Sequence, residues 1–262
     1  MAVVANDIVV YASAVMPTGD ILSPGGAIDT TVKMTFTDMA ATDGLVMSSN
    51  GLSDSVKVDV TGRNAGGSIV TDQFVVHETL DRIPGISATS FERILRMAIS
   101  SGSHTGTITV EQDNTPTYTP IGTMPSGVSG IYRPFYNVSS AADHAKEYFE
   151  KVFVKNNNTV NNLLSCNVFE SGEVGFSDKI VFDLEATGNS DGASSNNRLG
   201  PPPQSQLLGN DTGNWTSAAK AVPGTDLYAG SGIGVWLKLD LATSETSDKG
   251  SWNIGISGST TA

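Results

Sequence analysis

The chain of 262 residues has little of what most catalytic, metal-binding and nucleic-acid-binding sites require. Its single cysteine, Cys166, excludes an intramolecular disulfide and zinc sites built from two or four cysteines. The three histidines, His77, His104 and His144, are far apart and have no ligand-like spacing. Charged residues make up 16% of the chain, and 27 acidic side chains outnumber 15 basic ones, for a net charge of −12. An acidic surface repels phosphate, and the sequence shows no basic patch, so we expect no nucleic-acid partner.

Long apolar runs are also missing. No run approaches the roughly 18 residues that a membrane-spanning helix needs. The N-terminal residues 1–11 lack a basic region and are interrupted by Asn6 and Asp7, so we expect no secretory signal, although Ala-Ser-Ala at 12–14 imitates a cleavage site. A hydrophobic fraction of 39% is too high for a disordered chain and too low for a membrane protein. We expect a soluble protein without a membrane partner.

Turn residues and short alternating segments are abundant, with 28 glycines and 11 prolines. Apolar and polar residues alternate in 31–36 and 56–60, the pattern of half-buried antiparallel strands. The ambiguous segment 90–99 is assigned to a strand because its neighbours are strands, and the one helix expected is short, at 140–147. The other expected strands are 8–11, 69–76, 107–110, 147–155, 163–169, 179–184, 233–241 and 252–256.

A segment rich in proline and glycine, residues 113–130, separates two halves of similar character. Proline removes a backbone donor and fixes φ, so this stretch predicts a connection between domains. We expect an all-β protein of two antiparallel β-sandwich domains, Ig-like or jelly-roll-like, with long loops. The N-terminal domain would cover residues 1–115, the linker 116–134 and the C-terminal domain 135–262. A faint echo between residues 91–94 and 149–152 fits either two related domains or chance.

Three sequence features that could bind a ligand or react chemically have simpler structural explanations. Residues 230–234, Gly-Ser-Gly-Ile-Gly, resemble a phosphate loop, but a strand follows where a helix N-terminus is needed, so we expect a turn. Asp183 and Glu185 with 189–192 offer oxygen ligands for calcium but lack EF-hand spacing, and are expected to belong to a surface loop. Cys166 alternates with apolar neighbours and is expected to be a buried small hydrophobe.

No catalytic constellation stands out. No Gly-x-Ser-x-Gly motif surrounds a serine, and no pair of carboxylates is singled out, so we expect no enzyme activity, no cofactor and no metal. The histidines are expected to be surface or satisfied core residues. Among the tryptophans, Trp236 and Trp252 are expected to anchor the last two strands in the core. Trp215 lies in a polar loop, where it would be available to a sugar ring.

Several segments together resemble a family of tailed-bacteriophage virion proteins. In the first half these are Phe36-Thr-Asp-Met-Ala-Ala-Thr-Asp at 36–43, the segment 53–71 and Ser-Phe-Glu-Arg-Ile-Leu at 90–95; in the second half they are 149–156, 232–238 and 252–258. The resemblance covers most of the chain. Its motifs are strand-and-turn motifs, so it implies a setting among head and structural proteins and carries over no catalytic residue.

The resemblance implies a structural virion protein that is made in the host cytoplasm. An acidic protein fits the outside of a DNA-filled shell, so we expect a capsid decoration or cement protein on the outer capsid surface. Its partners would be the major capsid protein and neighbouring copies of itself, as a homo-oligomer. The alternatives are a neck, tail or fibre component and, from a different class, a carbohydrate-binding module around Trp215. Candidate contact segments are 3–11, 113–134 and 187–217.

Overall fold

The computed structural model describes residues 2–14, 26–35, 37–77, 89–114, 116–136, 138, 140–174, 180–190, 200–211, 214–244 and 250–260. In this part of the chain the fold is all-β, as expected, and no helix reaches seven residues. None of the described helices could span a membrane. Short 3-10 turns occur at η1 (Ala5–Asp7), η3 (Gln204–Gln206) and η4 (Leu208–Asn210).

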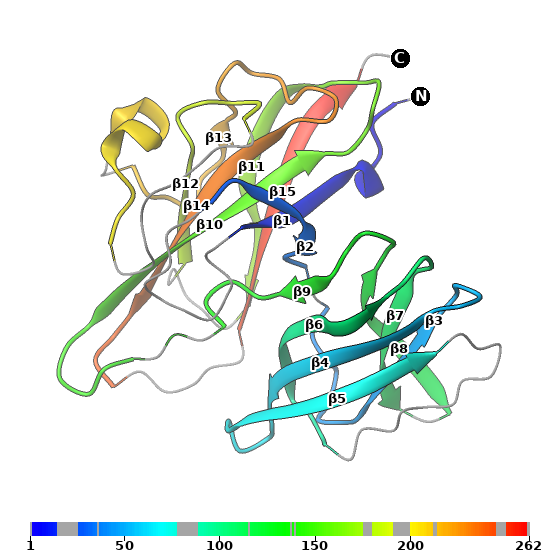
Figure 1. Cartoon of the computed structure of the whole chain (residues 1–262). Coiled ribbons are helices and arrows are strands. Elements are labelled where there is room, and N and C mark those ends of the chain that lie inside the picture. Colours follow the sequence, from blue (N-terminus) through cyan, green and yellow to red (C-terminus); the bar gives the residue numbers. More distant parts are fainter. Residues whose placement is uncertain are drawn as a thin grey trace. The chain divides into compact units, whose positions relative to one another are not determined.

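The chain forms two compact units, and one is inserted into the other along the sequence (Figure 1). Unit 1 consists of Met1–Asp29 together with Asn137–Ala262, and unit 2 is the continuous segment Thr30–Tyr136. The chain passes from unit 1 to unit 2 within strand β2 (Ile28–Lys33). This division differs from the expected succession of a domain at 1–115 and a domain at 135–262.

The expected linker at 116–134 was wrong, because this segment is part of the sheet structure of unit 2. Strand β8 (Thr117–Met124) pairs antiparallel with β7 (Ile108–Asn114). Pro120 is accommodated because β8 is an edge strand and the register shifts beside it, between Val110 and Glu111. These are the two settings in which a sheet tolerates a residue without a backbone donor.

Unit 2 contains two groups of strands around one core. In one group the order is β9 (Gly130–Tyr132), β6 (Arg93–Ser103), β4 (Ser55–Arg63) and β5 (Ile69–His77), and β2 pairs parallel with β9. In the other group β7 lies between β3 (Leu45–Ser49) and β8. The strand assignment of 90–99 is confirmed from Arg93 onward, and β4 and β5 form the expected hairpin, with the turn glycine Gly67 at φ 76°.

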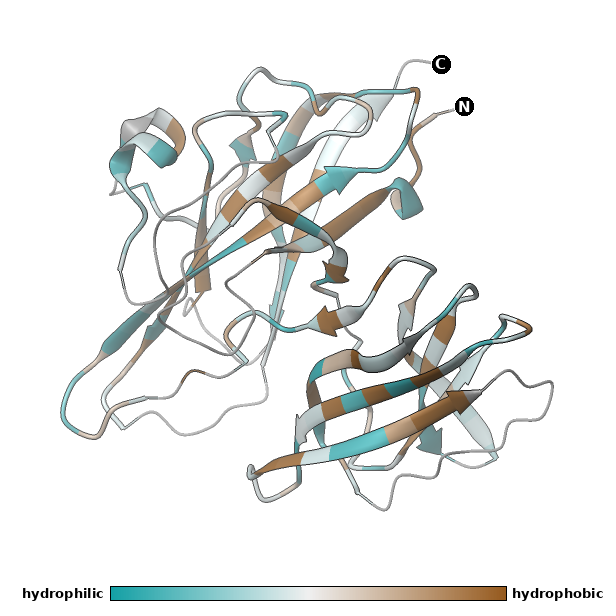
Figure 2. Ribbon diagram, in the orientation of Figure 1, coloured by the Kyte–Doolittle hydropathy of each residue, from teal (hydrophilic) through white to brown (hydrophobic). Residues whose placement is uncertain are grey.

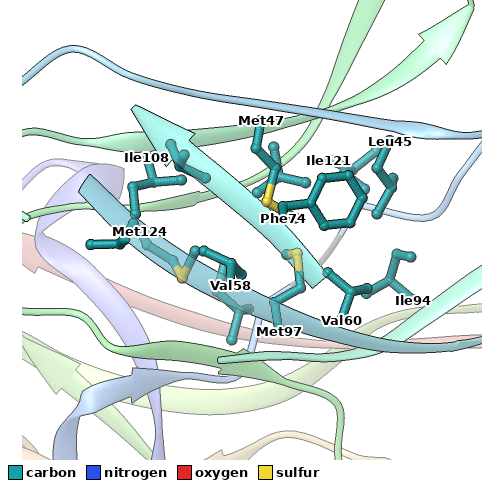
Figure 3. Close-up of a cluster of buried hydrophobic side chains, with 14 of the residues drawn as sticks. Leu45, Met47, Val58, Val60, Phe74, Ile94, Met97, Ile108, Ile121 and Met124 are labelled. Atoms are coloured by element: carbon teal, nitrogen blue, oxygen red, sulfur yellow. The ribbon is translucent and has the colours of Figure 1, made fainter. Parts of the chain in front are cut away.

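Alternation along β4 explains the core of unit 2. Val56, Val58 and Val60 are buried and the residues between them are partly or fully exposed, which Figure 2 shows as alternating brown and teal along this strand. Figure 3 shows side chains from both groups of strands meeting in this core. Its members include Leu45, Met47, Val58, Val60, Phe74, Phe91, Ile94, Met97, Ile108, Ile121 and Met124.

Unit 1 contains a sheet in the order β12 (Ile180–Leu184), β14 (Gly232–Leu241), β10 (Lys146–Asn156) and β1 (Ile8–Ser13). A second sheet has the order β13 (Lys220–Ala221), β11 (Leu163–Val174) and β15 (Ser251–Thr260). The two sheets contact each other, since the ring of Phe182 on β12 lies 6.3 Å from that of Trp252 on β15.

The helix expected at 140–147 was wrong. Residues 140–145 form bends and irregular backbone, and β10 already begins at Lys146. An isolated helix of two turns is unstable in water because its first hydrogen-bonded turn is costly to form. Here the segment gains more from leading into a strand that pairs with β14 along ten residues.

Substitution of Phe91 by alanine tests the core of unit 2. Phe91 is fully buried, and Gly62 leaves the room that its ring occupies, because a Cβ there would come within 2.5 Å of Phe91 Cδ1. We expect Phe91→Ala to lower the free energy of unfolding by about 3–5 kcal/mol. Leu52→Ala is the control, since Leu52 is 84% exposed, and should change it by less than about 0.5 kcal/mol. Equal losses of unfolding free energy for the two variants in urea would contradict the placement of Phe91 in the core.

Candidate functional site

The most unusual group of side chains in the described structure is a set of buried charges on one face of strands β12, β14 and β10. The register places Lys151, Trp236 and Asp183 directly beside one another across the three strands. Glu185, two residues after Asp183, projects from the same face because side chains alternate along a strand. Leu207 and Trp215 pack against Trp236 and cover this face.

The first buried pair joins β10 to the end of β12. Lys151 Nζ lies 2.6 Å from Glu185 Oε1, with side-chain exposures of 0% and 8%. The ammonium also lies 4.7 Å from the ring centre of Phe153 and 5.6 Å from that of Trp236. Gly234 makes room for the pair, since a Cβ there would come within 2.6 Å of both side chains. Burial lowers the pKa of Lys151, and the Glu185 carboxylate opposes that shift.

The second buried pair joins β12 to the first residue of β13. Lys220 Nζ donates to Asp183 Oδ1 and to the backbone carbonyl of Asn214, and both side chains are almost fully buried. The Leu184 backbone N–H donates to the same Oδ1 at 2.8 Å. Asp183 Oδ2 is buried without a hydrogen-bond partner. Burial raises the pKa of Asp183, and the contact with Lys220 opposes that shift.

These pairs change the interpretation of the oxygen-rich segment after β12. Asp183 and Glu185, considered above as calcium ligands in a surface loop, are buried and each faces a lysine. Asp191 and Gly192, the other end of that segment, lie outside the described residues. Among the described residues, no three histidine, cysteine, aspartate or glutamate side chains are grouped to hold a metal ion. The face therefore offers paired charges rather than an open ligand set.

The histidines lie in separate places. His104 spans a turn of unit 2, with Nδ1 2.8 Å from the Gly106 carbonyl and Nε2 2.9 Å from the Val128 carbonyl. His144 is exposed, with Nδ1 2.6 Å from Asp143 Oδ1. His77 is the last residue of β5, opposite Ser55 in the register.

Asp54 has a strongly shifted pKa, which in an unfamiliar protein can mark a catalytic group. It accepts hydrogen bonds from Ser49 Oγ at 2.5 Å and from the backbone N–H groups of Thr105 and Gly106 at 2.7 and 3.1 Å. These donors favour the charged carboxylate and lower its pKa to about 2. Asp54 joins the loop after β3 to the loop after β6, so its role is structural.

An arginine cluster in unit 2 is not apparent from the sequence. Asp38 Oδ1 lies 2.5 Å from Arg133 Nη2 and 3.7 Å from Arg93 Nε, and Arg133 also donates to the Ile94 carbonyl. Burial and the neighbouring Arg93 lower the pKa of Arg133 to about 10. The three charged residues are up to 95 positions apart, so only the fold reveals that they meet.

Two of the tryptophans, Trp215 and Trp236, pack together, and Trp252 packs against Phe182. Trp236 is fully buried, as expected, and Trp252 is partly buried against Phe182. Trp215 is also partly buried, and its ring centre lies 5.6 Å from that of Phe149. The three rings do not form one exposed aromatic face of the kind that a sugar-binding surface would present.

Two structural interpretations of motifs are confirmed. Cys166 is buried, its Sγ lies 2.9 Å from the Leu163 carbonyl, and burial raises the pKa of the thiol. Gly230 has φ 75° in a turn, and β14 starts at Gly232, so residues 230–234 are a turn followed by a strand.

The three candidate contact segments contribute to the fold of their own units. Within 3–11, β1 pairs with β10, and within 113–134, β8 and β9 are paired strands. In the segment 187–217, described at 187–190, 200–211 and 214–217, Thr216 forms a bridge to Phe182 along the edge of β12. Their backbones are therefore largely engaged within the chain.

Comparison with known proteins identifies no relative of this chain. No family model matches the chain, and no similar curated protein or solved structure was found.

Removal of Lys151 tests the first buried pair. Lys151→Met leaves Glu185 as a buried carboxylate without its cation, and we expect a loss of about 3–5 kcal/mol in the free energy of unfolding. The double variant Lys151→Met/Glu185→Leu removes both charges and should recover most of that loss. Urea unfolding of both variants would measure this, and a double variant as unstable as the single one would contradict it.

The lowered pKa of Asp54 predicts that the stability of the fold depends on pH. Its pKa is about 2 in the folded protein and roughly 3.9 in an unfolded chain, so the carboxylate stabilises the fold above pH 4 and this contribution is lost as the pH falls toward 2. Asp54→Asn should therefore be destabilising at pH 6, by an amount that shrinks between pH 5 and pH 2. Urea unfolding at several pH values measures this, and a constant difference would refute it.

Proposed function

We propose that this protein is a structural component of a tailed-phage virion, namely a decoration or cement protein that binds the outer capsid and neighbouring copies of itself. Each unit would be a β-sandwich whose role is to present strand edges and loops to partners. The neck, tail or fibre remains the alternative location within the same class. The proposal rests on the sequence resemblance and on one structural feature, the edge strand β15.

Strand β15 is an edge with an unusual composition. Its ten residues include no charged side chain and no proline, and β11 is its strand neighbour in the described structure. Soluble proteins protect edge strands from pairing with other chains by charge, proline, shortness or cover. Of the other edge strands, β8 carries Pro120, β12 is bridged by Thr216, β5 carries Asp72, β13 has two residues, and β3 has five residues, four of them buried.

In the described part of the chain β15 lacks these protective features, so it fits a surface that another chain covers. An added strand gains main-chain hydrogen bonds along its length and requires no chemistry at the contact. Residues 257–259 are exposed, small and uncharged, and would let a partner strand approach closely. This is the kind of contact that a protein repeated over a lattice can use.

The charge distribution supports a position outside a DNA-filled shell. By sequence, unit 1 holds 17 acidic and 8 basic residues, and unit 2 holds 10 and 7. A surface of this sign repels the phosphates of packaged DNA. The buried lysines are paired with carboxylates, which lowers their contribution to any attraction for an anion.

The location is tested by the copy number per purified particle. Quantitative mass spectrometry against the major capsid protein should give hundreds of copies, as a lattice-bound protein requires. A number near six or twelve would place the protein at the neck or tail instead. Absence from particles would refute a virion role.

The role of β15 is tested by charge on its exposed residues. We expect Ser257→Lys/Ser259→Lys to weaken binding to particles that lack the protein by about tenfold or more, because charge on an edge opposes pairing with another strand. Ser68→Lys is the matched control, since Ser68 is an exposed turn residue of unit 2. Circular dichroism would verify folding, and equal binding of both variants would remove β15 from the interface.

A further inference from the structure

The Lys220–Asp183 pair is buried almost completely, which an ordinary ion pair at a protein surface is not. Both side chains are almost completely buried, at 6% and 0% exposure, and the pair is placed where strand β12 faces the segment that enters β13. Burying two charges costs several kcal/mol per ion before their attraction is counted. A chemical step that removes both charges would remove that cost.

We propose that Lys220 and Asp183 condense to form an intramolecular amide bond between Lys220 Nζ and Asp183 Cγ. The bond would join β12, in one sheet of unit 1, to β13, in the other sheet. This inference does not depend on the proposed virion role, since it follows from the buried pair alone.

The step balances without an oxidant, a reductant or a further reactant. Within the buried pair a proton passes from the ammonium to the carboxylate, giving a neutral amine and a neutral acid in which Oδ2 carries the proton and Oδ1, which accepts the Leu184 N–H, is the carbonyl oxygen. The nitrogen lone pair attacks Cγ, the C–Oδ2 bond breaks, and one proton from nitrogen joins the departing hydroxyl. The products are one secondary amide and one water molecule.

The contacts around Asp183 are consistent with Oδ1 staying in the amide and Oδ2 leaving in the water molecule. Oδ1 accepts the Leu184 N–H, which would stabilise negative charge on that oxygen as the amine attacks. Oδ2, buried without a hydrogen-bond partner, is the oxygen free to leave. The Asn214 carbonyl already accepts from Nζ and would keep the single N–H of the amide satisfied. Burial also raises the pKa of Asp183, which favours the neutral acid that the step requires.

The Lys151–Glu185 pair is less suited to the same chemistry. The Lys151 ammonium lies over two aromatic rings, at 4.7 and 5.6 Å, whereas Lys220 has one ring, that of Phe182, at 6.0 Å. Aromatic faces stabilise a cation and so oppose conversion to the free amine. Lys151 and Glu185 therefore serve as the internal comparison.

The intact mass of the purified folded protein, measured after denaturation, tests the proposal. We expect a mass about 18 Da below that of the sequence, the loss of one water. Trypsin does not cleave after an acylated lysine, so the digest should contain peptide 180–198 joined to peptide 199–238, with Lys220 uncleaved. That branched peptide also distinguishes the amide from cyclisation at Asp191-Gly192, which loses water within peptide 180–198 alone.

Two matched variants locate the bond. Lys220→Arg keeps the positive charge, but its guanidinium stays protonated, so this variant should have its full sequence mass. Lys151→Arg changes the other pair and should still lose one water. A wild-type chain at its full sequence mass after prolonged incubation in the folded state, with separate peptides 180–198 and 199–220, would overturn the proposal even if neither variant folds. Loss of water that depends on Lys151 instead would overturn the assignment to Lys220.

Discussion

The ladder between β10 and β14 is the interaction on which the rest of unit 1 depends. It runs from Lys146–Leu241 to Lys155–Gly232, and β10 is buried on both faces over most of its length. The face of the sheet that carries Lys151 and Trp236 meets the cover of Leu207 and Trp215. Because a doubly buried strand cannot turn its charged residues toward water, Lys151 must find its partner inside the protein.

This constraint explains why the face of the sheet that Leu207 and Trp215 cover carries oppositely charged side chains in pairs. A lysine without a carboxylate, or a carboxylate without a lysine, would carry the full cost of desolvation, whereas apolar replacements of both would not. The pairs thus contribute selectivity: they favour the register in which Lys151 lies near Glu185 and Asp183 near Lys220. Gly234, opposite Phe153 in that register, is the small residue that makes the first pair fit.

The sequence predicted strands best where only one face of the strand is buried. Val56, Val58 and Val60 alternate with polar residues, and the structure buries the three valines. Prediction failed where a local rule competed with tertiary context. Pro120 indicated a linker, but an edge strand with a register shift accepts it. Strand β3, Leu45–Ser49, was missed because its residues are buried on both faces at four of five positions and give no alternation.

The buried pairs were missed for a related reason. Asp183 and Glu185 were recognised as oxygen donors, but their lysine partners come from β10 and from β13, which are distant in the sequence. The available signal was two charged residues, Glu150 and Lys151, inside the apolar run 148–154, since such a strand leaves little room for an exposed charge. Spacing along the chain carries no information about contacts of this kind.

The insertion of unit 2 into unit 1 determines the order in which the newly made protein can assemble. Residues 30–136 form a continuous unit that can fold as soon as it has left the ribosome. Strand β1 is synthesised earlier and has β2 as one neighbour, yet Ile8 pairs with Asn156, so its pairing with β10 must wait until all of unit 2 and β10 have been translated. During that interval the edge of β1 that later pairs with β10 is open to chaperones or to other nascent chains. Completion of unit 1 therefore comes after the synthesis of unit 2.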